Sequence, residues 1–572
     1  MTRRTELLDG VWSFLTDRDE KGEQRGWHTA TFDSEGWLQA PVPGTWESYL
    51  DGLFGYAGHA WYRREFRVDP AWQGSRVLLR FEAANYETTV WLNGELLGVH
   101  RGGFDPFDFD ITDRLDWGDE NVLAVRVDNW PRLNRVPNSM AGWWNYGGIF
   151  RSVKLLSMPT VRIDDVFVHA EPGEGADDAP LTVEVTLVNE STEPVDVSVN
   201  GRVALGEGAV SLTGDLSCAA QSLAPGERRT IRLAAGIPAA RLWSPDRPNL
   251  YTLHLGLLQD GVPVDTQAVR FGVRKFEVRG TQFFLNGEPI LLTGFNRHEE
   301  YYGNGRVDPG GVLQQDLRAI KEMNGNMVRM HYQSHPDMYV LCDEMGLMCF
   351  AEIPMWGVAN KDLSEWEAPE VWETTEQMLR TLIGSLKNHA SVVIWSVGNE
   401  CATNREEARP LIGHLADLAR TLDATRPVAY VGMFGADEKC FDLVDIPCLN
   451  VYRGLDHAAM KERADLTQAL EPGKPLLMTE FGHEAVHGLH GVGYGTEDEQ
   501  AEVLEGNWLA LHELSDRVAG TIIWCLADYW HMPMGPDFHW MNRIYFSHGV
   551  LTLDRKPKMA VETVKRMWSR VD

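Results

Sequence analysis

The chain has 572 residues, of which 44% are hydrophobic and 24% are charged. This balance is typical of a folded protein with a large core, and the length is too great for a single ordinary domain. The formal net charge of −30 repels the phosphate backbone of nucleic acids and anionic lipid head groups, so we expect neither as a partner.

Two further features bear on the cellular compartment. The seven cysteines form no C-x-x-C pair, so neither a zinc ribbon nor a disulfide framework is predicted. The N-terminal residues MTRRTELLDG lack the apolar region of a signal peptide, and no stretch approaches the ~18 apolar residues of a membrane span. We therefore expect a cytoplasmic protein that does not associate with membranes.

The first half of the chain is predicted to form two β-domains. Short alternating apolar and polar runs, separated by Gly, Asn and Asp, are typical of β-sandwiches, and Asn93-Gly94 is a strong hairpin signal. We place the first sandwich at 1–160 and a second, smaller one at 161–275. The expected strands are 62–68, 77–82, 88–92 and 122–127 in the first, and 161–169, 181–189 and 222–233 in the second.

Residues 276–572 show a different pattern, in which apolar runs alternate with longer helical stretches such as 311–323, 337–345 and 557–570. Eight such runs predict a (β/α)₈ barrel, also called a TIM barrel. The expected strands are 290–295, 327–331, 348–353, 392–397, 428–431, 448–452, 476–479 and 520–526.

Two glutamates follow or end strands of this predicted barrel. The fourth strand delivers Asn399 and Glu400, and the seventh delivers Glu480, so both carboxyl groups are expected at the functional face of the barrel. Cleavage of a glycosidic bond requires two facing carboxyl groups, one to protonate the departing oxygen and one to attack the anomeric carbon or activate water. The alternative is that each glutamate caps its strand or pairs with an arginine.

The motifs SVVIWSVGNE, MTEFGHEAVHGLH, LLTGFNRHEE, VRMHYQSHP and GWWNYGGIFR resemble those of glycoside hydrolase family 2, which includes β-galactosidases, β-glucuronidases and β-mannosidases. The resemblance covers essentially the whole chain. It implies a multidomain β and α/β protein: an N-terminal jelly-roll sugar-binding domain, an immunoglobulin-like β-sandwich and a catalytic C-terminal TIM barrel. The length and the TEFG…GLH stretch look most like the β-glucuronidase branch.

By this resemblance Glu400 would be the general acid/base and Glu480 the nucleophile of a retaining double displacement. We then expect opposite tuning of the two, with Glu400 protonated near neutral pH and Glu480 ionised. Arg329 and Tyr452 end strands two and six, where they could hold Glu480 as a carboxylate.

Other residues at the strand ends are candidates for contacts with the sugar, although each could instead serve packing. Asn399 is placed to bind the sugar 2-hydroxyl, and Trp524 to form an apolar floor beneath the ring. The remaining candidates are His298, His331, Tyr332 and, from the first domain, Trp143.

The sugar is predicted from a departure from the family pattern. β-Glucuronidases bind the uronate carboxylate with an Asn-x-Lys pair, whereas the corresponding stretch 545–549 reads YFSHG and contains His548 but neither Asn nor Lys. Asn542 and Arg543 lie just upstream and could substitute. We favour a neutral galactose-type β-glycoside, with a pentose or furanose ring left open, and a uronidase with a non-standard carboxylate site as the alternative.

No metal or other cofactor is expected. The Glu-x-His magnesium site of large β-galactosidases is absent, since residues 351–357 read AEIPMWG and retain only Glu352. Residues 483–487 fit the zinc-protease motif H-E-x-x-H, but the glycines around them argue for a loop, where the two histidines do not share a helix face. The stretch 491–495 reads GVGYG and is only a weak match to a nucleotide-binding loop, because no helix is expected to begin there.

Two expectations concern partners. The partner is a carbohydrate substrate, and relatives commonly assemble as dimers or tetramers, so the resemblance implies a homo-oligomer. A non-catalytic sugar-binding protein is the alternative of another class, although keeping both glutamates argues for turnover.

Overall fold

The structure is a computed structural model that describes residues 3–138, 142–173, 178–532 and 544–569. The chain divides into two compact units. The N-terminal unit comprises Met1–Trp130, Tyr146–Arg274 and Asn388–Ala390, and the barrel unit comprises Pro131–Asn145, Lys275–Lys387 and Ser391–Asp572.

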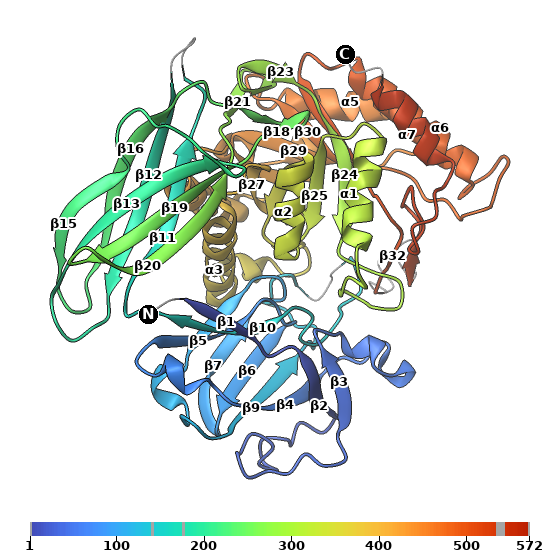
Figure 1. Cartoon of the computed structure of the whole chain (residues 1–572). Coiled ribbons are helices and arrows are strands. Elements are labelled where there is room, and N and C mark those ends of the chain that lie inside the picture. The colour runs from blue at the N-terminus through green and yellow to red at the C-terminus, as the bar shows by residue number, and fades with distance from the viewer. Residues whose placement is uncertain (1–2, 139–141, 174–177, 533–543, 570–572) are drawn as a thin grey trace. The chain divides into compact units, whose positions relative to one another are not determined.

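The N-terminal unit begins with a β-sandwich of one six-stranded sheet, in the order β3-β2-β4-β9-β6-β7, and one four-stranded sheet, in the order β1-β10-β5-β8 (Figure 1). Alternate residues of β5 face the core, among them Val77 and Leu79, as the period of a half-buried strand requires. The strands are β1 (Arg4–Leu7), β2 (Gly10–Asp17), β3 (Leu38–Val42), β4 (His59–Phe66), β5 (Arg76–Phe81), β6 (Glu87–Leu92), β7 (Glu95–Arg101), β8 (Phe107–Asp110), β9 (Asn121–Asp128) and β10 (Val153–Met158).

The hairpin predicted at Asn93-Gly94 joins β6 to β7, with Leu92 paired to Glu95. Both turn residues have positive φ, 52° and 86°, which is the backbone of a type I′ turn and explains the Asn-Gly sequence.

The second sandwich of this unit packs the sheet β11-β12-β16 against a five-stranded sheet in which β14, β13, β19 and β20 follow one another and β15 also pairs with β13. The prediction of one strand over 222–233 is wrong. Pro225 and Gly226, the latter at φ 75°, break it into β15 and β16, which lie in different sheets. The strands are β11 (Val161–Ala170), β12 (Ala179–Asn189), β13 (Val195–Leu205), β14 (Gly208–Ala209), β15 (Ser217–Leu223), β16 (Arg228–Ile237), β17 (Trp243–Ser244), β18 (Arg247–Pro248), β19 (Tyr251–Gln259) and β20 (Val262–Phe271).

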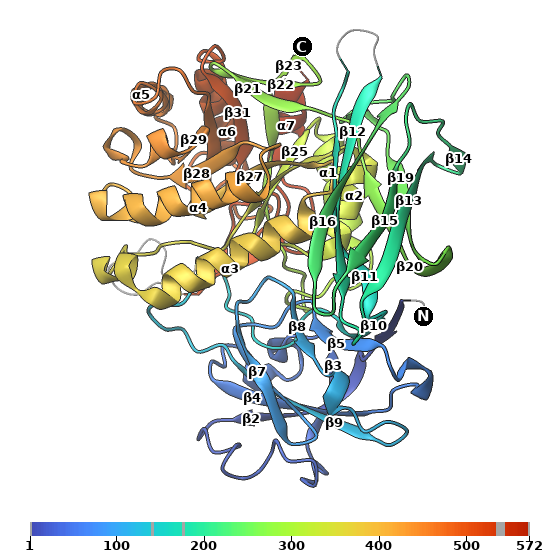
Figure 2. The ribbon, with the colours of Figure 1, turned by 90° about the vertical axis from the view of Figure 1, so that its left-hand side faces the viewer.

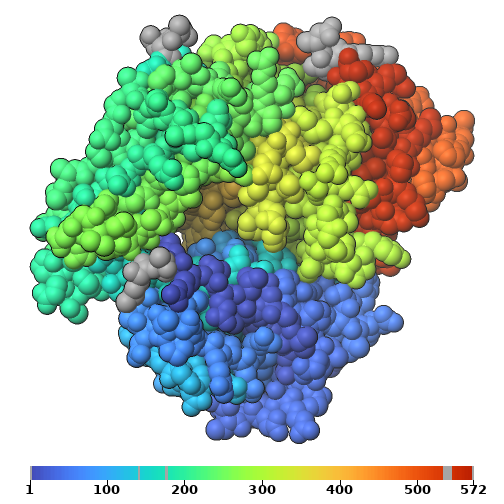
Figure 3. All heavy atoms as spheres, viewed as in Figure 1, coloured from blue at the N-terminus to red at the C-terminus, as the bar shows by residue number. Residues whose placement is uncertain are grey.

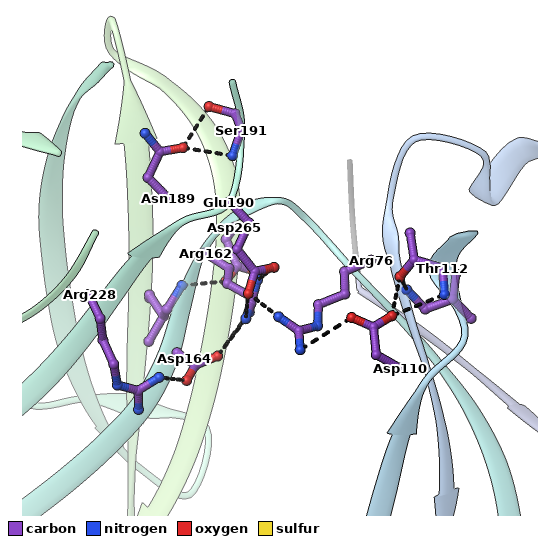
Figure 4. A network of polar contacts seen from close by, with 12 residues as sticks. Arg76, Asp110, Thr112, Arg162, Asp164, Asn189, Glu190, Ser191, Arg228 and Asp265 are labelled. Atoms are coloured by element: carbon purple, nitrogen blue, oxygen red, sulfur yellow. Dashed lines mark hydrogen bonds and ion pairs between the residues drawn. The ribbon is translucent and has the colours of Figure 1, made fainter. Parts of the chain in front are cut away.

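A chain of ion pairs links the two sandwiches of the N-terminal unit (Figure 4). Arg76 on β5 pairs with Asp110 at 3.4 Å and also with Glu190 of the second sandwich. Glu190 accepts two hydrogen bonds from Arg162, at 2.6 and 2.9 Å, and Arg162 also pairs with Asp164. Because neighbouring members share partners, the network fixes geometry better than isolated surface pairs would.

The barrel unit contains a closed barrel of eight parallel strands, β24 to β31, which confirms the predicted TIM barrel. The strand bounds differ from the predicted ranges by up to three residues, and only β25 matches its range at both ends. The barrel strands are β24 (Leu292–His298), β25 (Met327–His331), β26 (Met348–Glu352), β27 (Val392–Asn399), β28 (Val428–Gly432), β29 (Ile446–Asn450), β30 (Leu476–Phe481) and β31 (Val518–Ile523).

Two small sheets flank the barrel in sequence. Before it come β21 (Phe276–Arg279), β22 (Gln282–Leu285) and β23 (Glu288–Ile290), and after it come β32 (Tyr529–Trp530) and β33 (Tyr545–Phe546). The pairing of β32 with β33 brings the segment 545–549 back to the end of the last barrel strand.

Helices cover the outside of the barrel, with α3 and α4 side by side in Figure 2. In the space-filling view, atoms of the segment that carries α1 and α2 form a continuous surface on one face of the barrel unit (Figure 3). Local sequence sets their ends: α2 starts with Pro336 and stops at Gly346, which is left-handed. The helices are α1 (Val312–Glu322), α2 (Pro336–Met345), α3 (Pro369–Leu386), α4 (Arg409–Leu422), α5 (His457–Gln468), α6 (Glu497–His512) and α7 (Ala560–Trp568).

Among the described helices, none combines the length and the apolar character that a membrane crossing would need.

Candidate active site

Glu400 lies immediately after β27, in a backbone conformation with φ 52° that residues with a Cβ rarely adopt. Its Oε1 accepts a hydrogen bond from Asn450 Nδ2 at 2.9 Å, and its Oε2 accepts one from Trp356 Nε1 at 3.0 Å. Both donors are uncharged, so neither offers the Glu400 carboxylate a positive charge.

Glu480 lies within β30, where it is buried. Its Oε1 accepts a hydrogen bond from Arg329 Nη1 at 2.8 Å, and its Oε2 accepts one from the Tyr452 hydroxyl at 2.8 Å. His331 Nε2 is 3.5 Å from the same Oε1. Unlike Glu400, Glu480 therefore has a direct cationic partner.

The pKa values of the two glutamates are set by burial and by their neighbours. Burial raises the pKa of Glu400 to about 7, and the negative charge of Glu480 adds to that rise. Burial also raises the pKa of Glu480, while the Arg329 guanidinium and the Tyr452 hydroxyl oppose the rise. The expectation of opposite shifts is therefore not met: both pKa values rise, and what distinguishes the two glutamates is that only Glu480 has a cationic partner.

Asn450, at the end of β29, lies between the two carboxyl groups. Its amide nitrogen donates to Glu400 and to Asn399 Oδ1, 3.0 Å away, and the same amide lowers the pKa of Glu480. Thr479 donates to the Asn450 oxygen at 2.8 Å and so fixes the orientation of the amide. Sequence reasoning missed Asn450, because the predicted strand 448–452 placed it in the middle of the strand, whereas β29 ends at this residue.

Arg329 is fully buried on β25 and connects Glu480 to a third acid. Its Nη2 donates to Glu352 Oε1 at 2.9 Å, and Ser396 donates to Glu352 Oε2 at 2.7 Å. Burial raises the pKa of Glu352 to about 7, against the lowering effect of Arg329. Glu352 thus shares the arginine with Glu480. We call Glu400, Glu480, Glu352, Arg329 and Asn450 the carboxylate cluster.

Aromatic side chains lie beside this cluster. His298 packs its ring against Trp524 at 5.2 Å and Tyr529 at 4.4 Å. The Phe546 ring stacks on Tyr529 at 5.5 Å and on His548 at 4.9 Å. We call Trp524, Tyr529, His298, Phe546 and His548 the aromatic wall; Tyr529 and Phe546 were not among the predicted residues.

Two side chains, Tyr452 and His331, connect the aromatic wall to the carboxylate cluster. The Tyr452 ring, whose hydroxyl binds Glu480, is 6.0 Å from the His548 ring. The His331 ring, next to Glu480, is 4.9 Å from Trp524. A group bound at the two glutamates would therefore have an aromatic neighbour.

The other predicted residues are placed as follows. Burial keeps the pKa of His298 and of His331 well below the usual range, so both imidazoles are neutral. Asn399 Nδ2 is 3.5 Å from His331 Nε2. The Trp143 ring is 5.4 Å from Tyr332 and 5.8 Å from Trp356. Asn542 and Arg543 lie outside the described residues.

Lys558 lies beneath the segment 545–549 and is fully buried as a side chain. Its ammonium donates to Asp528 at 2.7 Å, to the Ser547 carbonyl at 3.0 Å and to the Ala485 carbonyl at 2.8 Å. Gln500 donates to the His548 and Gly549 carbonyls, both at 3.2 Å. These contacts fix the backbone that carries Phe546 and His548.

The H-E-x-x-H stretch 483–487 is not helical, and the described residues contain no group of three or more His, Cys, Asp or Glu placed to hold a metal ion. No helix begins within 491–495, but α6 starts two residues later, at Glu497, and is capped by Thr496. The first turn of α6 holds Glu497, Asp498 and Glu499, whose negative charges would repel a phosphate at this helix end.

Comparisons with known proteins agree with this architecture. Family models described as glycosyl hydrolases family 2 match residues 5–159 (sugar binding domain), 161–274 and 276–572 (TIM barrel domain). The chain is 30% identical to a β-glucuronidase of Paenibacillus borealis, over 100% of this chain and 98% of that one. It is 28% identical to a β-galactosidase of Pseudoalteromonas haloplanktis, over 96% of this chain and 54% of that one.

Among solved structures, Ruminococcus gnavus β-glucuronidase superimposes with a TM-score of 0.88 at 26% identity, covering 99% of this chain and 97% of that one. Since the barrel model alone spans more than half of the chain, the sequence match extends well beyond a local motif. The chain belongs to family 2 of the glycosyl hydrolases and is a glycosidase.

Proposed function

We propose that the protein is a retaining exo-β-glycosidase that releases a neutral, galactose-type sugar from the non-reducing end of its substrate. The observation that supports it most is the environment of the two glutamates. Glu480 is bound to a guanidinium and Glu400 only to uncharged donors, and the Asn450 amide acts on both.

In the first step the Glu480 carboxylate attacks the anomeric carbon while Glu400 gives its proton to the departing glycosidic oxygen. The bond between carbon and leaving oxygen breaks, and a covalent glycosyl-enzyme forms. In the second step Glu400, now ionised, takes a proton from water; the water oxygen attacks the anomeric carbon and Glu480 leaves. A Glu400 pKa of about 7 suits a group that must give and then take a proton near neutral pH.

Two observations favour retention of configuration over inversion. Retaining enzymes need their carboxyl groups about 5 to 5.5 Å apart, closer than an inverting pair that must leave room for water. Here one amide, that of Asn450, bonds to Glu400 and also lowers the pKa of Glu480. Glu480 also has the arginine and tyrosine donors that keep a nucleophile ionised.

The preference for a neutral sugar rests on the aromatic wall. At the stretch that corresponds to Asn-x-Lys, Phe546 and His548 stack on each other. The nearby cation Lys558 already donates to Asp528 and two backbone carbonyls. A uronate carboxylate would therefore meet rings at this point, and burying a charge without a partner is costly.

A β-glucuronidase is the second candidate, because the Paenibacillus borealis relative and the Ruminococcus gnavus structure carry that name. This candidate requires that side chains other than an Asn-x-Lys pair donate hydrogen bonds to the uronate carboxylate.

Chromogenic substrates test both candidates. We expect release from nitrophenyl β-galactopyranoside at a kcat/KM at least about tenfold above that for nitrophenyl β-glucuronide. The reverse ratio would replace the first candidate by the second. β-Galactofuranoside, β-mannoside and α-arabinoside complete the panel, and proton NMR of the first product formed reports its configuration, with the β-anomer expected.

A further inference from the structure

The turn that carries Glu400 is held by a second set of buried polar groups, none of which belongs to the aromatic wall. The turn runs from Glu400 to Thr403 and starts in a left-handed conformation, which a glutamate adopts only when surrounding contacts enforce it. Cys401 and Thr403 in this turn are fully buried.

Tyr430 on β28 makes the first of these contacts. The Cys401 backbone N–H donates to the Tyr430 hydroxyl at 3.0 Å, and the Tyr430 hydroxyl lies 3.1 Å from Thr403 Oγ1. One hydroxyl thus bonds to both ends of the three-residue segment that follows the catalytic carboxyl group.

Glu438 makes the second contact. Thr403 Oγ1 donates to Glu438 Oε2 at 2.6 Å, and the Phe434 N–H donates to Glu438 Oε1 at 3.0 Å. The Tyr430 hydroxyl in turn donates to the Cys401 carbonyl at 3.4 Å. These hydrogen bonds connect Cys401, Tyr430, Thr403 and Glu438 in one network.

The site of Glu438 is closely fitted to this use. Glu438 is 5% exposed, and it packs against Gly432 at the end of β28, where an added Cβ would lie 2.1 Å from Glu438 Oε1. Only glycine leaves room for the carboxyl group there. A buried acid is costly to keep, and the proposed reaction uses neither Glu438 nor Tyr430 directly.

We infer that Tyr430, Thr403 and Glu438 are positioning residues, which fix the turn 400–403 so that the Glu400 carboxyl group faces the leaving oxygen. This inference rests on the proposed role of Glu400 as acid/base. Loss of these hydrogen bonds would let the turn relax and would misplace the proton donor, while Glu480 on β30 would keep its own contacts.

The test uses Tyr430→Phe and Thr403→Val, which remove one hydroxyl each and keep the side-chain volume nearly constant. Activity is measured on aryl β-glycosides of the preferred sugar, one with a dinitrophenyl leaving group and one with a poor alkyl leaving group. We expect kcat/KM for the alkyl glycoside to fall about tenfold or more, and that for the dinitrophenyl glycoside to fall less than about twofold. Glu438→Gln should give the same pattern.

Thr375→Val is the matched control, because Thr375 is also fully buried and its hydroxyl donates within α3, to the Val371 carbonyl at 2.7 Å. This variant should lower the melting temperature without changing the ratio of kcat/KM for the alkyl glycoside to kcat/KM for the dinitrophenyl glycoside. Equal losses on both substrates in Tyr430→Phe and Thr403→Val would overturn the inference.

Glu400→Ala separates the two hypotheses. Glu400→Ala is expected to lose more activity on the alkyl glycoside than on the dinitrophenyl glycoside. If it does so and Tyr430→Phe and Thr403→Val do not, only the positioning role fails. If Glu400→Ala itself lacks that difference, the proposed acid/base role fails, and the positioning role fails with it.

Discussion

The carboxylate cluster and the aromatic wall are adjacent but differ in chemistry. In the carboxylate cluster each acid accepts hydrogen bonds from specific side chains, and one arginine donates to both Glu480 and Glu352. The aromatic wall is a stack of rings in which both Trp524 and Phe546 are almost fully buried. We infer a division of labour: the cluster determines which bond is broken, and the wall determines which sugar is accepted. Substitutions in the two regions should then change different measurements.

The largest effect is expected from Glu480→Gln, which removes the proposed nucleophile and keeps the side-chain shape. Activity should fall by at least about 10⁴-fold on every substrate, because no glycosyl-enzyme can form. Steady-state rates on the dinitrophenyl glycoside check this, with Glu462→Gln, an exposed glutamate on α5, as the control. A loss that depended on the sugar would contradict the division between the two regions.

Glu400→Ala should lower kcat/KM by about 10²-fold or more on alkyl glycosides and much less on dinitrophenyl glycosides, since only the former need protonation. The measurement is a plot of log kcat/KM against the pKa of the leaving group, which should become steeper than in the unmodified enzyme. Parallel plots would assign Glu400 another role.

The pH profile sharpens the assignment further. Burial raises the pKa of Glu400 to about 7, and the proposed first step requires Glu400 to be protonated, so kcat/KM should fall about tenfold per pH unit above pH 7. The sign follows from the role, because an acid catalyst is lost as pH rises through its pKa. The alkaline limb should disappear in Glu400→Ala; its persistence there would attribute the limb to another group.

The aromatic wall is tested by introducing the missing motif, with Phe546→Asn combined with His548→Lys. The ratio of kcat/KM for β-glucuronide over β-galactoside should rise about tenfold or more, because an ammonium and an amide replace two rings beside a uronate. Each single variant serves as a control for the other. If the ratio stays constant while both activities fall, the wall does not contact that part of the sugar.

The smallest effect is expected from metal removal. Exhaustive chelation with EDTA should change kcat/KM by less than about twofold, as the proposed steps use only side chains and water. Loss of activity that zinc restores would revive the H-E-x-x-H interpretation.

The sequence was most informative where burial dominates. Every residue of the eight barrel strands is buried and most are apolar, and β25 lies at the residues predicted for it. The prediction of one strand across Pro225-Gly226 was wrong, because the alternation of apolar and polar residues resumes after the turn and so hides the turn. Glu400 and Glu480 stand out as charges at the ends of such runs, whereas a strand-end asparagine such as Asn450 has no distinctive pattern.

Two members of the aromatic wall, Tyr529 and Phe546, were missed for another reason. Tyr529 and Phe546 lie on short strands, β32 and β33, that meet only in three dimensions. Ring stacking between them leaves no periodic signal in the sequence.

The anchoring of the segment 545–549 bears on how this enzyme could change. Lys558 and Gln500 bind the Ser547, His548 and Gly549 carbonyls, which every amino acid possesses. The loop scaffold therefore survives replacement of the side chains it displays. The side chains of this loop can therefore be substituted, by evolution or by design, to accept new glycans while the backbone and the carboxylate cluster stay unchanged.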